Sequence, residues 1–304
     1  MAAPWEAERV VSAERARELV ERAVPELRGA SVRSLAAGWD HTVFVVDGRW
    51  VARFPRRAVA LPGFRRELAV LPSLAPLLPL PVPVPRWTGT DDDEADPWPF
   101  ALTTLLPGEE LAATGLPDRD RVAVAVALGG FLRELHAPGP RRAAGTDLPV
   151  DPLRRATPAA SAASTREQLG LLADSGVPIA SAALDGLLDD GARLGPPTGA
   201  PVLVHGDLHV RHLLLRDGAA AGVIDWGDVC LADPAVDLAL AYAAFAGDAR
   251  TALLEVYGPV DGERELRSRC LAVRLSVFLA RYALAQGDAA LLEESRQGLA
   301  RAVG

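Results

Sequence analysis

Four side chains that can bind metals or move protons lie close together in the segment VLVHGDLHVRHLLL: His205, Asp207, His209 and His212. Two kinds of chemistry use such groups, a metal site built from imidazoles and a loop in which a carboxylate accepts a proton. His205 and His209 are four residues apart and would share one face of a helix, as in the HExxH metalloproteases. However, Gly206 interrupts that helix and no glutamate stands at the position of the general base. The sequence therefore disfavours a catalytic zinc site.

Asp207 also fits a longer pattern that includes the downstream tetrapeptide IDWG. His212 lies five residues after Asp207, and Asp225 lies eighteen residues after it. Protein kinases show the same order, H-R-D-L-x-x-x-N and then, after a hairpin, D-F-G. In phosphoryl transfer a carboxylate orients the attacking hydroxyl group, and two further ligands hold Mg²⁺ against the phosphates. Order and spacing together therefore predict phosphoryl transfer.

The segments VLVHGDLHVRHLLL and GVIDWGDVCLADPAVDLALAY resemble the aminoglycoside phosphotransferase family, the kinase-like antibiotic kinases. The resemblance implies that Asp207 is the catalytic base and that Asp225 is a ligand of Mg²⁺. The second metal position holds His212, where asparagine is usual and where macrolide-phosphorylating members resemble this sequence in carrying histidine. Because Mg²⁺ prefers oxygen ligands, direct binding by His212 and hydrogen bonding beside the metal both stay open here. His205 is expected to brace the loop by hydrogen bonds rather than to accept a proton. Asp233 and Asp237 are expected to be structural, as carboxylates at the start of a helix.

The resemblance covers about residues 30 to 245 and includes the N-terminal third. There, GWDHTVFVVDGRWVARFPR resembles the family's nucleotide loop and following strand, and RREL resembles its αC segment. This implies Gly38 in the loop, Arg53 as the cation that contacts phosphate, and Glu67 as its acidic partner. Two features depart from the kinase pattern, since the loop has a single glycine and the usual lysine is an arginine. WPFALTTLLPGEEL resembles the hinge, whose backbone would meet the adenine or guanine edge near Thr103, Thr104 and Leu105.

The acceptor is expected to bind between the helical insert near 145–195 and the last helices. An aminoglycoside would need several carboxylates that converge on its ammonium groups, whereas a macrolide would need mainly an apolar cleft with one carboxylate. The sequence supplies both elements and does not choose between them. The candidate acceptor-binding residues are His209, Asp228, Asp288, Glu293 and Glu294.

The predicted function is transfer of the γ-phosphate of ATP or GTP, with Mg²⁺, to a hydroxyl group of an antibiotic. One alternative is a metabolite kinase on the same fold that acts on choline, a sugar amine or an amino-alcohol. Another is a nucleotide-binding pseudokinase, which the sparse glycine loop and the arginine and histidine replacements would allow. The presence of both Asp207 and Asp225 favours the active kinase over the pseudokinase.

The elements that must position these residues indicate an α+β, bilobal, protein-kinase-like fold. We expect a small β-rich N-lobe over residues 1–104 and a larger helical C-lobe over 105–304. Ser12 is predicted to be the N-cap of a helix over 12–24. Asp-Gly pairs at 47–48 and 217–218 predict two tight hairpins.

Three further patterns concern helices. The segment GFRRELAVL is expected to be a helix that Pro72 ends. Apolar residues spaced four, three and four apart predict two core-facing helical stripes. These stripes are Val124, Leu128, Phe131 and Leu135, and Leu271, Leu275, Phe278 and Tyr282.

Composition limits the partners. The chain has 304 residues, 49% of them hydrophobic, with a net charge of −8, which disfavours nucleic acid and anionic membranes as partners. Its two cysteines fit no CxxC spacing, so neither disulfides nor a structural zinc site is expected. This cysteine usage indicates a reducing compartment, the cytoplasm.

No apolar stretch predicts a membrane span. We expect a cytoplasmic monomer or homodimer with a small-molecule substrate. The chain contains no lysine, so any essential cation must be arginine.

Overall fold

The computed structural model describes residues 7–38, 40–92, 97–145 and 147–304. The chain divides into two compact units. The first comprises the chain up to Pro76 together with Val82–Leu106, and the second comprises Leu77–Pro81 and Pro107–Gly304. The short segment Leu77–Pro81 joins the second unit, where the Pro81 carbonyl accepts a hydrogen bond from the Val223 N–H at 2.9 Å.

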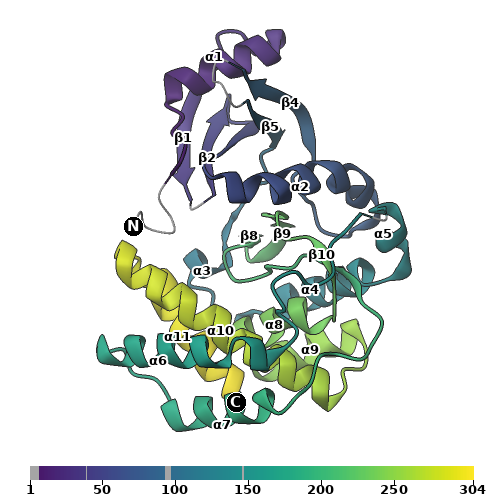
Figure 1. The fold of residues 1–304 in the computed structure, drawn as a ribbon, viewed down its shortest axis with the longest axis vertical. Coiled ribbons are helices and arrows are strands. Elements are labelled where there is room, and N and C mark those ends of the chain that lie inside the picture. The colour runs from purple at the N-terminus through teal and green to yellow at the C-terminus, as the bar shows by residue number, and fades with distance from the viewer. Residues whose placement is uncertain (1–6, 39, 93–96, 146) are drawn as a thin grey trace. The chain divides into compact units, whose positions relative to one another are not determined.

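The first unit is built on a five-stranded antiparallel sheet with the order β1-β2-β3-β5-β4 (Figure 1). Aromatic and aliphatic side chains on one face of the sheet, including Phe44, Phe54 and Phe100, form its buried core with helix α1 (Ala13–Ala23). The strands are β1 (Val32–Ala37), β2 (His41–Val46), β3 (Trp50–Pro55), β4 (Pro85–Asp91) and β5 (Trp98–Thr104).

The β2–β3 connection confirms the first predicted hairpin. Asp47 and Gly48 both have positive φ, 50° and 64°, as a type I′ turn requires. Because this turn fixes the register of the hairpin, Arg53 pairs with Val43 on one side and with Ala101 of β5 on the other. The turn therefore helps to place the predicted phosphate-contacting arginine in the centre of the sheet.

The α-helices α1 and α2 (Leu61–Leu74) belong to the first unit. The Ser12 hydroxyl accepts the N–H of Arg15 at 3.1 Å, which confirms the predicted N-cap. The prediction that Pro72 ends the second helix is wrong, because α2 continues to Leu74. Near the C-terminal end a proline removes only one intrahelical hydrogen bond, and the buried side chains of Leu71 and Leu74 keep the last turn packed.

The second unit contains short strands and most of the helices. Two strands flank the predicted catalytic segment, β7 (Val202–Val204) before it and β8 (Leu213–Arg216) after it. β8 and β9 (Ala219–Val223) form the second predicted hairpin, with positive φ at Asp217 and Gly218. The remaining strands are β6 (Glu109–Glu110), which pairs with β8, and β10 (Cys230–Ala232), which pairs with β7.

Helices make up most of the second unit, and α6 and α7 of the insert pack against α10 (Figure 1). α4 carries the first predicted stripe, and all four of its residues are buried. The helices are α3 (Leu111–Thr114), α4 (Val122–Leu135), α5 (Pro138–Ala143), α6 (Ala162–Asp174), α7 (Ser181–Ala192), α8 (Ala235–Ala244), α9 (Gly247–Tyr257), α10 (Gly262–Gln286) and α11 (Ala289–Val303).

The second predicted stripe, on α10, is only partly a core stripe. Leu271 is buried, but Phe278 is 36% exposed and Tyr282 is half-buried. Guanidinium groups cover both rings, with Arg274 lying 4.8 Å from the Phe278 ring centre and Arg211 lying 5.5 Å from that of Tyr282. The spacing alone could not distinguish a core stripe from one that ends in cation–π contacts at the surface.

Among the described residues, no helix combines the length and the apolar character that crossing a bilayer would require.

Candidate active site

A buried carboxylate fixes the backbone of the predicted catalytic loop. Asp237, near the start of α8, accepts the N–H of His205 at 2.8 Å and the N–H of Gly206 at 3.0 Å. His136 at the end of α4 faces the same carboxylate, with Nε2 3.2 Å from Oδ2. Burial alone would raise the pKa of Asp237, but the hydrogen bond and charge of His136, and then His205, lower it. The structure therefore supports the expected structural role of Asp237. Its carboxylate holds the backbone of the catalytic loop at His205 and Gly206.

Gly206 is required by the shape of the loop. Its φ is +90°, a conformation that residues with a side chain rarely adopt. A Cβ atom built on it would lie 2.2 Å from the carbonyl oxygen of Asp228. The close approach of these two backbone segments brings Asp207 next to the loop that begins at Asp225.

His205 braces the loop from inside, as predicted. It is completely buried, and its Nε2 donates to the carbonyl of Ile224 at 2.9 Å. Its Nδ1 then accepts the N–H of Asp207 at 3.3 Å. Burial lowers the pKa of His205, so a neutral ring with both nitrogens bonded to backbone is the form that fits.

His212 presents one nitrogen to Asp225. Its Nδ1 lies 2.7 Å from the carbonyl oxygen of Asp207 and must donate to it. In the neutral ring this leaves the lone pair on Nε2, which lies 3.4 Å from Oδ2 of Asp225. Asp225 has φ +65°, a conformation that non-glycine residues adopt mainly at constrained sites. The three residues identified from spacing thus lie together in the second unit.

This pair of ligand atoms fits a divalent cation. Two ligands about 2.1 Å from one Mg²⁺ ion, at a right angle, lie about 3 Å apart, close to the separation of His212 and Asp225. The side chain of Asp225 is 49% exposed and supplies the oxygen that Mg²⁺ prefers. The imidazole nitrogen is a less favoured ligand, but its orientation, fixed through Nδ1, is that of a metal-binding histidine.

A second group of ligand atoms lies beside the first. One ligand atom each from Asp207, His209 and His212 falls within 4.8 Å of the others. The rings of His209 and His212 stack with centres 3.7 Å apart, and burial holds the pKa of His209 well below its usual value. His205 is not in this group, because its nitrogens bond to backbone, so the three-histidine cage considered from sequence does not form.

The structure adds a residue that the sequence did not reveal, Arg155. Its guanidinium donates to the Gly206 carbonyl at 2.5 Å and to Oδ1 of Asp207 at 3.1 Å, and Nη2 lies 2.8 Å from Oδ2 of Asp228. Asp228, a predicted acceptor-binding residue, is therefore close to Asp207 but paired. No motif marked Arg155, and the only signal was the absence of lysine, which requires arginine wherever a cation is needed.

In the first unit the two residues predicted to hold the nucleotide phosphates contact each other. Arg53 of β3 and Glu67 of α2 form a buried ion pair, and the Arg53 guanidinium lies 5.5 Å from the centre of the Phe64 ring. Glu67 is fully buried, so without Arg53 its carboxylate would be a buried charge with no compensating cation in this pair. The expected partnership between β3 and α2 is present.

The other predicted nucleotide-binding residues lie at the end of β5 and before β2. The N–H groups of Thr104 and Leu105 already donate to the carbonyls of Val84 and Arg49. These two residues would therefore bind the purine base through their carbonyl oxygens, as hydrogen-bond acceptors. Thr103 is buried and pairs with Val51 in the sheet. Gly38 has space for a Cβ atom, whose nearest neighbour is 3.8 Å away, and Trp39 of the expected loop lies outside the described residues.

Two acceptor-binding candidates on the last helix have local partners. Asp288 caps α11 by accepting the N–H of Leu291 at 3.0 Å. Glu293 accepts from Arg296 at 2.6 and 2.8 Å and from Gln297 at 2.8 Å. These hydrogen bonds lower the pKa of Glu293 to about 2. Both carboxylates are exposed, but each already has donors from its own helix.

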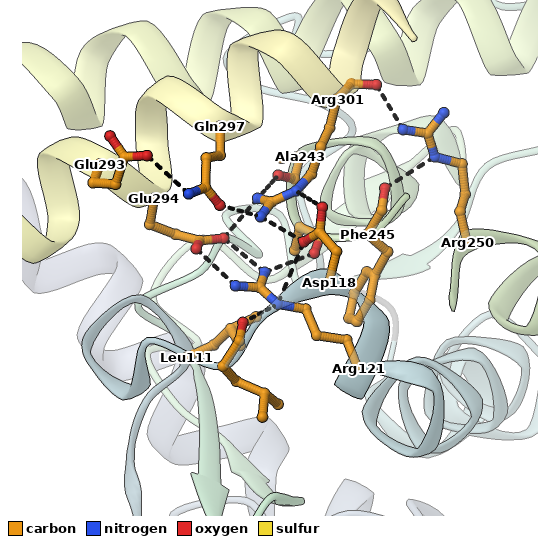
Figure 2. A network of polar contacts seen from close by, with 12 residues as sticks. Leu111, Asp118, Arg121, Ala243, Phe245, Arg250, Glu293, Glu294, Gln297 and Arg301 are labelled. Carbon is orange, nitrogen blue, oxygen red and sulfur yellow. Dashed lines mark hydrogen bonds and ion pairs between the residues drawn. The ribbon is translucent and has the colours of Figure 1, made fainter. Parts of the chain in front are cut away.

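Glu294 is not placed to bind an acceptor, contrary to the sequence-based expectation. It is 6% exposed and lies between the guanidinium groups of Arg121 and Arg301 (Figure 2). Its oxygens accept from Arg121 at 2.7 Å twice and from Arg301 at 2.7 Å, and Arg301 also pairs with Asp118. The carboxylate is committed to a buried network that joins α11 to the start of α4, so its role is structural.

Comparison with known proteins identifies the family of this chain. Residues 31–270 match the model of the phosphotransferase enzyme family. Viomycin phosphotransferase of Streptomyces vinaceus is 29% identical to this chain over 295 residues, covering 93% of this chain and 97% of its own.

Solved structures resemble most of the chain. A macrolide 2′-phosphotransferase, MphH from Brachybacterium faecium, is 27% identical with a TM-score of 0.57, covering 88% of this chain and 92% of its own. The GDP complex of aminoglycoside 2′-phosphotransferase-IIIa is 22% identical with a TM-score of 0.69, covering 96% and 99%. At this sequence identity, the similarity supports a shared fold and nothing more. That fold is kinase-like, with a β-sheet N-terminal region and a helical C-terminal region. The resemblance drawn from the sequence motifs is thus confirmed, and this chain belongs to the phosphotransferase enzyme family.

Proposed function

We propose that this phosphotransferase moves the γ-phosphate of ATP or GTP to a hydroxyl group of an antibiotic and thereby inactivates it. The observation that carries the proposal is the grouping of Asp207, His212 and Asp225. His212 binds the Asp207 carbonyl through Nδ1 and faces Asp225 through Nε2, so one imidazole links the expected base to the expected metal ligand. A family member without transfer activity would not need this arrangement.

Asp207 is the proposed catalytic base. Its side chain is 27% exposed, and its loop is held by Asp237 and Gly206, so the carboxylate is both accessible and oriented. The acceptor oxygen would attack the γ-phosphorus, the bond to the bridging oxygen would break, and the nucleoside diphosphate would leave. The hydroxyl proton would pass to Asp207.

Mg²⁺, held by Asp225 and His212, would neutralise charge on the phosphates when bound. The chain's own contribution is to hold these two side chains at a fixed separation. The backbone of Asp225 in its left-handed conformation and the hydrogen bond from His212 Nδ1 both restrict the site. Such orientation lowers the cost of assembling the ligands.

For the nucleotide, we propose that Arg53 contacts phosphate while Glu67 holds it in position. A guanidinium keeps its charge when buried and can grip phosphate with two donors. Backbone groups near Thr103, Thr104 and Leu105, with Gly38 in the preceding loop, are the proposed contacts for the base and phosphates. GDP and ADP complexes among the structural neighbours support a purine nucleotide donor.

An antibiotic acceptor is supported by the names of the relatives. They include a viomycin phosphotransferase, a macrolide 2′-phosphotransferase and a kanamycin complex of an aminoglycoside kinase. These molecules differ in charge and shape, so the relatives define a reaction class rather than one acceptor.

The test is an incubation of the chain with Mg²⁺, ATP or GTP, and a pooled panel of antibiotics and amino-alcohols, analysed by mass spectrometry. A product heavier by one phosphate among the antibiotics would support the proposal. A phosphorylated amino-alcohol would indicate a metabolite kinase instead. If no compound gained phosphate with either nucleotide while nucleotide binding was normal, a pseudokinase would be the better description.

A further inference from the structure

The segment that carries Arg155 is tightly fixed to the catalytic region. Val150 pairs in parallel with Leu231, the Asp151 N–H donates to the Leu231 carbonyl at 2.8 Å, and the Leu231 N–H donates to Pro149 at 2.9 Å. This adds an extended stretch beside β10, which itself pairs with β7 ahead of the catalytic loop. The segment therefore has a fixed position relative to Asp207.

The turn that follows directs Arg155 itself. Asp151 has φ +33°, and its carboxylate accepts the N–H groups of Arg155 at 2.8 Å and of Ala156 at 3.0 Å. From α10, Arg267 donates to the Ala156 carbonyl at 2.8 Å. With its backbone held on both sides, Arg155 loses little freedom when its guanidinium meets the loop.

Arg155 neutralises two carboxylates at once. Asp207 and Asp228, with side chains 27% and 42% exposed, both lie within ion-pair distance of its Nη2 atom. Burial would lower the pKa of Arg155, but the charges of Asp207 and Asp228 outweigh it and raise the pKa. The arginine is therefore charged at every physiological pH.

A second arginine adds positive charge to the same region. Arg274 lies on α10 seven residues after Arg267, hence on the same face, and donates to Ser164 of α6 at 3.0 Å. Among the residues the structure describes, it has no carboxylate partner within ion-pair distance. Burial and the charge of Arg155 both lower the pKa of Arg274. Arg155 and Arg274 thus add two positive charges to a region that also contains the carboxylates of Asp207, Asp228 and Asp225.

These two arginines oppose the binding of a polycation. Several ammonium groups would need carboxylates without partners, yet Asp228, Glu293 and Glu294 are all paired with arginines. An ammonium group beside Asp207 would also face the like charge of Arg155, which costs binding energy in a partly buried site.

We propose, as a refinement that rests on the function proposed above, that Arg155 is the specificity-determining residue of the acceptor site. It balances the charge around Asp207, so the site takes a hydroxyl group with neutral or acidic surroundings and excludes one flanked by several ammonium groups. Removing Arg155 would leave Asp207 and Asp228 uncompensated and would convert the site into one that attracts cations.

The test measures binding of kanamycin, a polycationic probe, by titration calorimetry without nucleotide. The variants are Arg155→Gln, the charge-conserving Arg155→Lys, and the control Arg193→Gln. Arg193 lies at the end of α7, pairs only locally with Asp190 and is 74% exposed, so its variant changes net charge equally. We expect Arg155→Gln to bind kanamycin at least about tenfold more tightly than the wild type, with a gain that shrinks at high salt. Arg155→Lys and Arg193→Gln should match the wild type.

Equal binding by Arg155→Gln and wild type, or the same gain in Arg193→Gln, would overturn the inference. If Arg155→Gln does not fold, Arg274→Gln removes a charge from the same group without a contact to the loop, and a smaller gain in kanamycin binding is expected. Phosphorylation of kanamycin by the wild type with a low KM would contradict the inference while supporting the proposed function. Failure to phosphorylate any compound would contradict the function, and the binding comparison would still test Arg155.

Discussion

The carboxylate of Asp237 holds the backbone of Gly206 through a hydrogen bond of 3.0 Å, although the two residues are 31 positions apart. The same carboxylate accepts the N–H of His205 and contacts His136, so α4, α8 and the catalytic loop meet at one buried charge. The residue that positions the proposed base thus lies on another element and outside the reacting groups.

Replacing Asp237 tests this arrangement. Asp237→Ala removes the acceptor of two backbone N–H groups in a fully buried site, and we expect it to lower the free energy of unfolding by about 3–5 kcal/mol. Asp237→Asn keeps one acceptor oxygen and should lose less. Urea denaturation followed by circular dichroism provides the measurement. A loss below about 1 kcal/mol in the alanine variant would mean that the clamp contributes little.

Asp237 also predicts a pH dependence. Its pKa in the folded protein is lowered from the ordinary value of 3.8, so the unfolded chain binds its proton first as pH falls. Its stabilisation is fully present above pH 4 or so and is lost as pH falls through the lower folded value. Compared with the wild type, Asp237→Asn should show a shallower loss of stability below about pH 4. The control is Asp217→Asn, at a turn position where the side chain is 91% exposed.

The features that could be predicted from the sequence are those set by residues close to one another along the chain. The two Asp-Gly hairpins and the Ser12 cap follow from local backbone chemistry, and Asp207, His212 and Asp225 were grouped by their spacing. Glu294 was misplaced because its partner Arg121 is 173 residues away, and Arg155 was missed because Asp207 is 52 residues away. No spacing rule covers such pairs. They arise only when the folded chain brings distant charges together.

The ion pair in the first unit leads to a prediction about nucleotide binding. In Glu67→Gln the charge that holds Arg53 is removed, and the guanidinium is expected to lose its fixed position. The KM for ATP or GTP should rise about tenfold, while the KM for the acceptor should change little. Steady-state kinetics with each substrate varied in turn would separate the two effects. An increase confined to the acceptor KM would contradict the proposed role of the pair.

The final prediction concerns Asp207 itself. Asp207→Asn keeps the size of the side chain and an acceptor for Arg155, but the amide cannot take the hydroxyl proton. We expect normal folding and nucleotide binding with kcat lowered by about 10²–10⁴-fold, the usual contribution of a positioned base. Asp217→Asn, which makes the same chemical change at an exposed turn, should keep wild-type turnover. Because the loop backbone is held by Asp237 rather than by Asp207, a loss of kcat in a folded variant would report on proton transfer. Near-wild-type turnover in Asp207→Asn would show that another group accepts the proton.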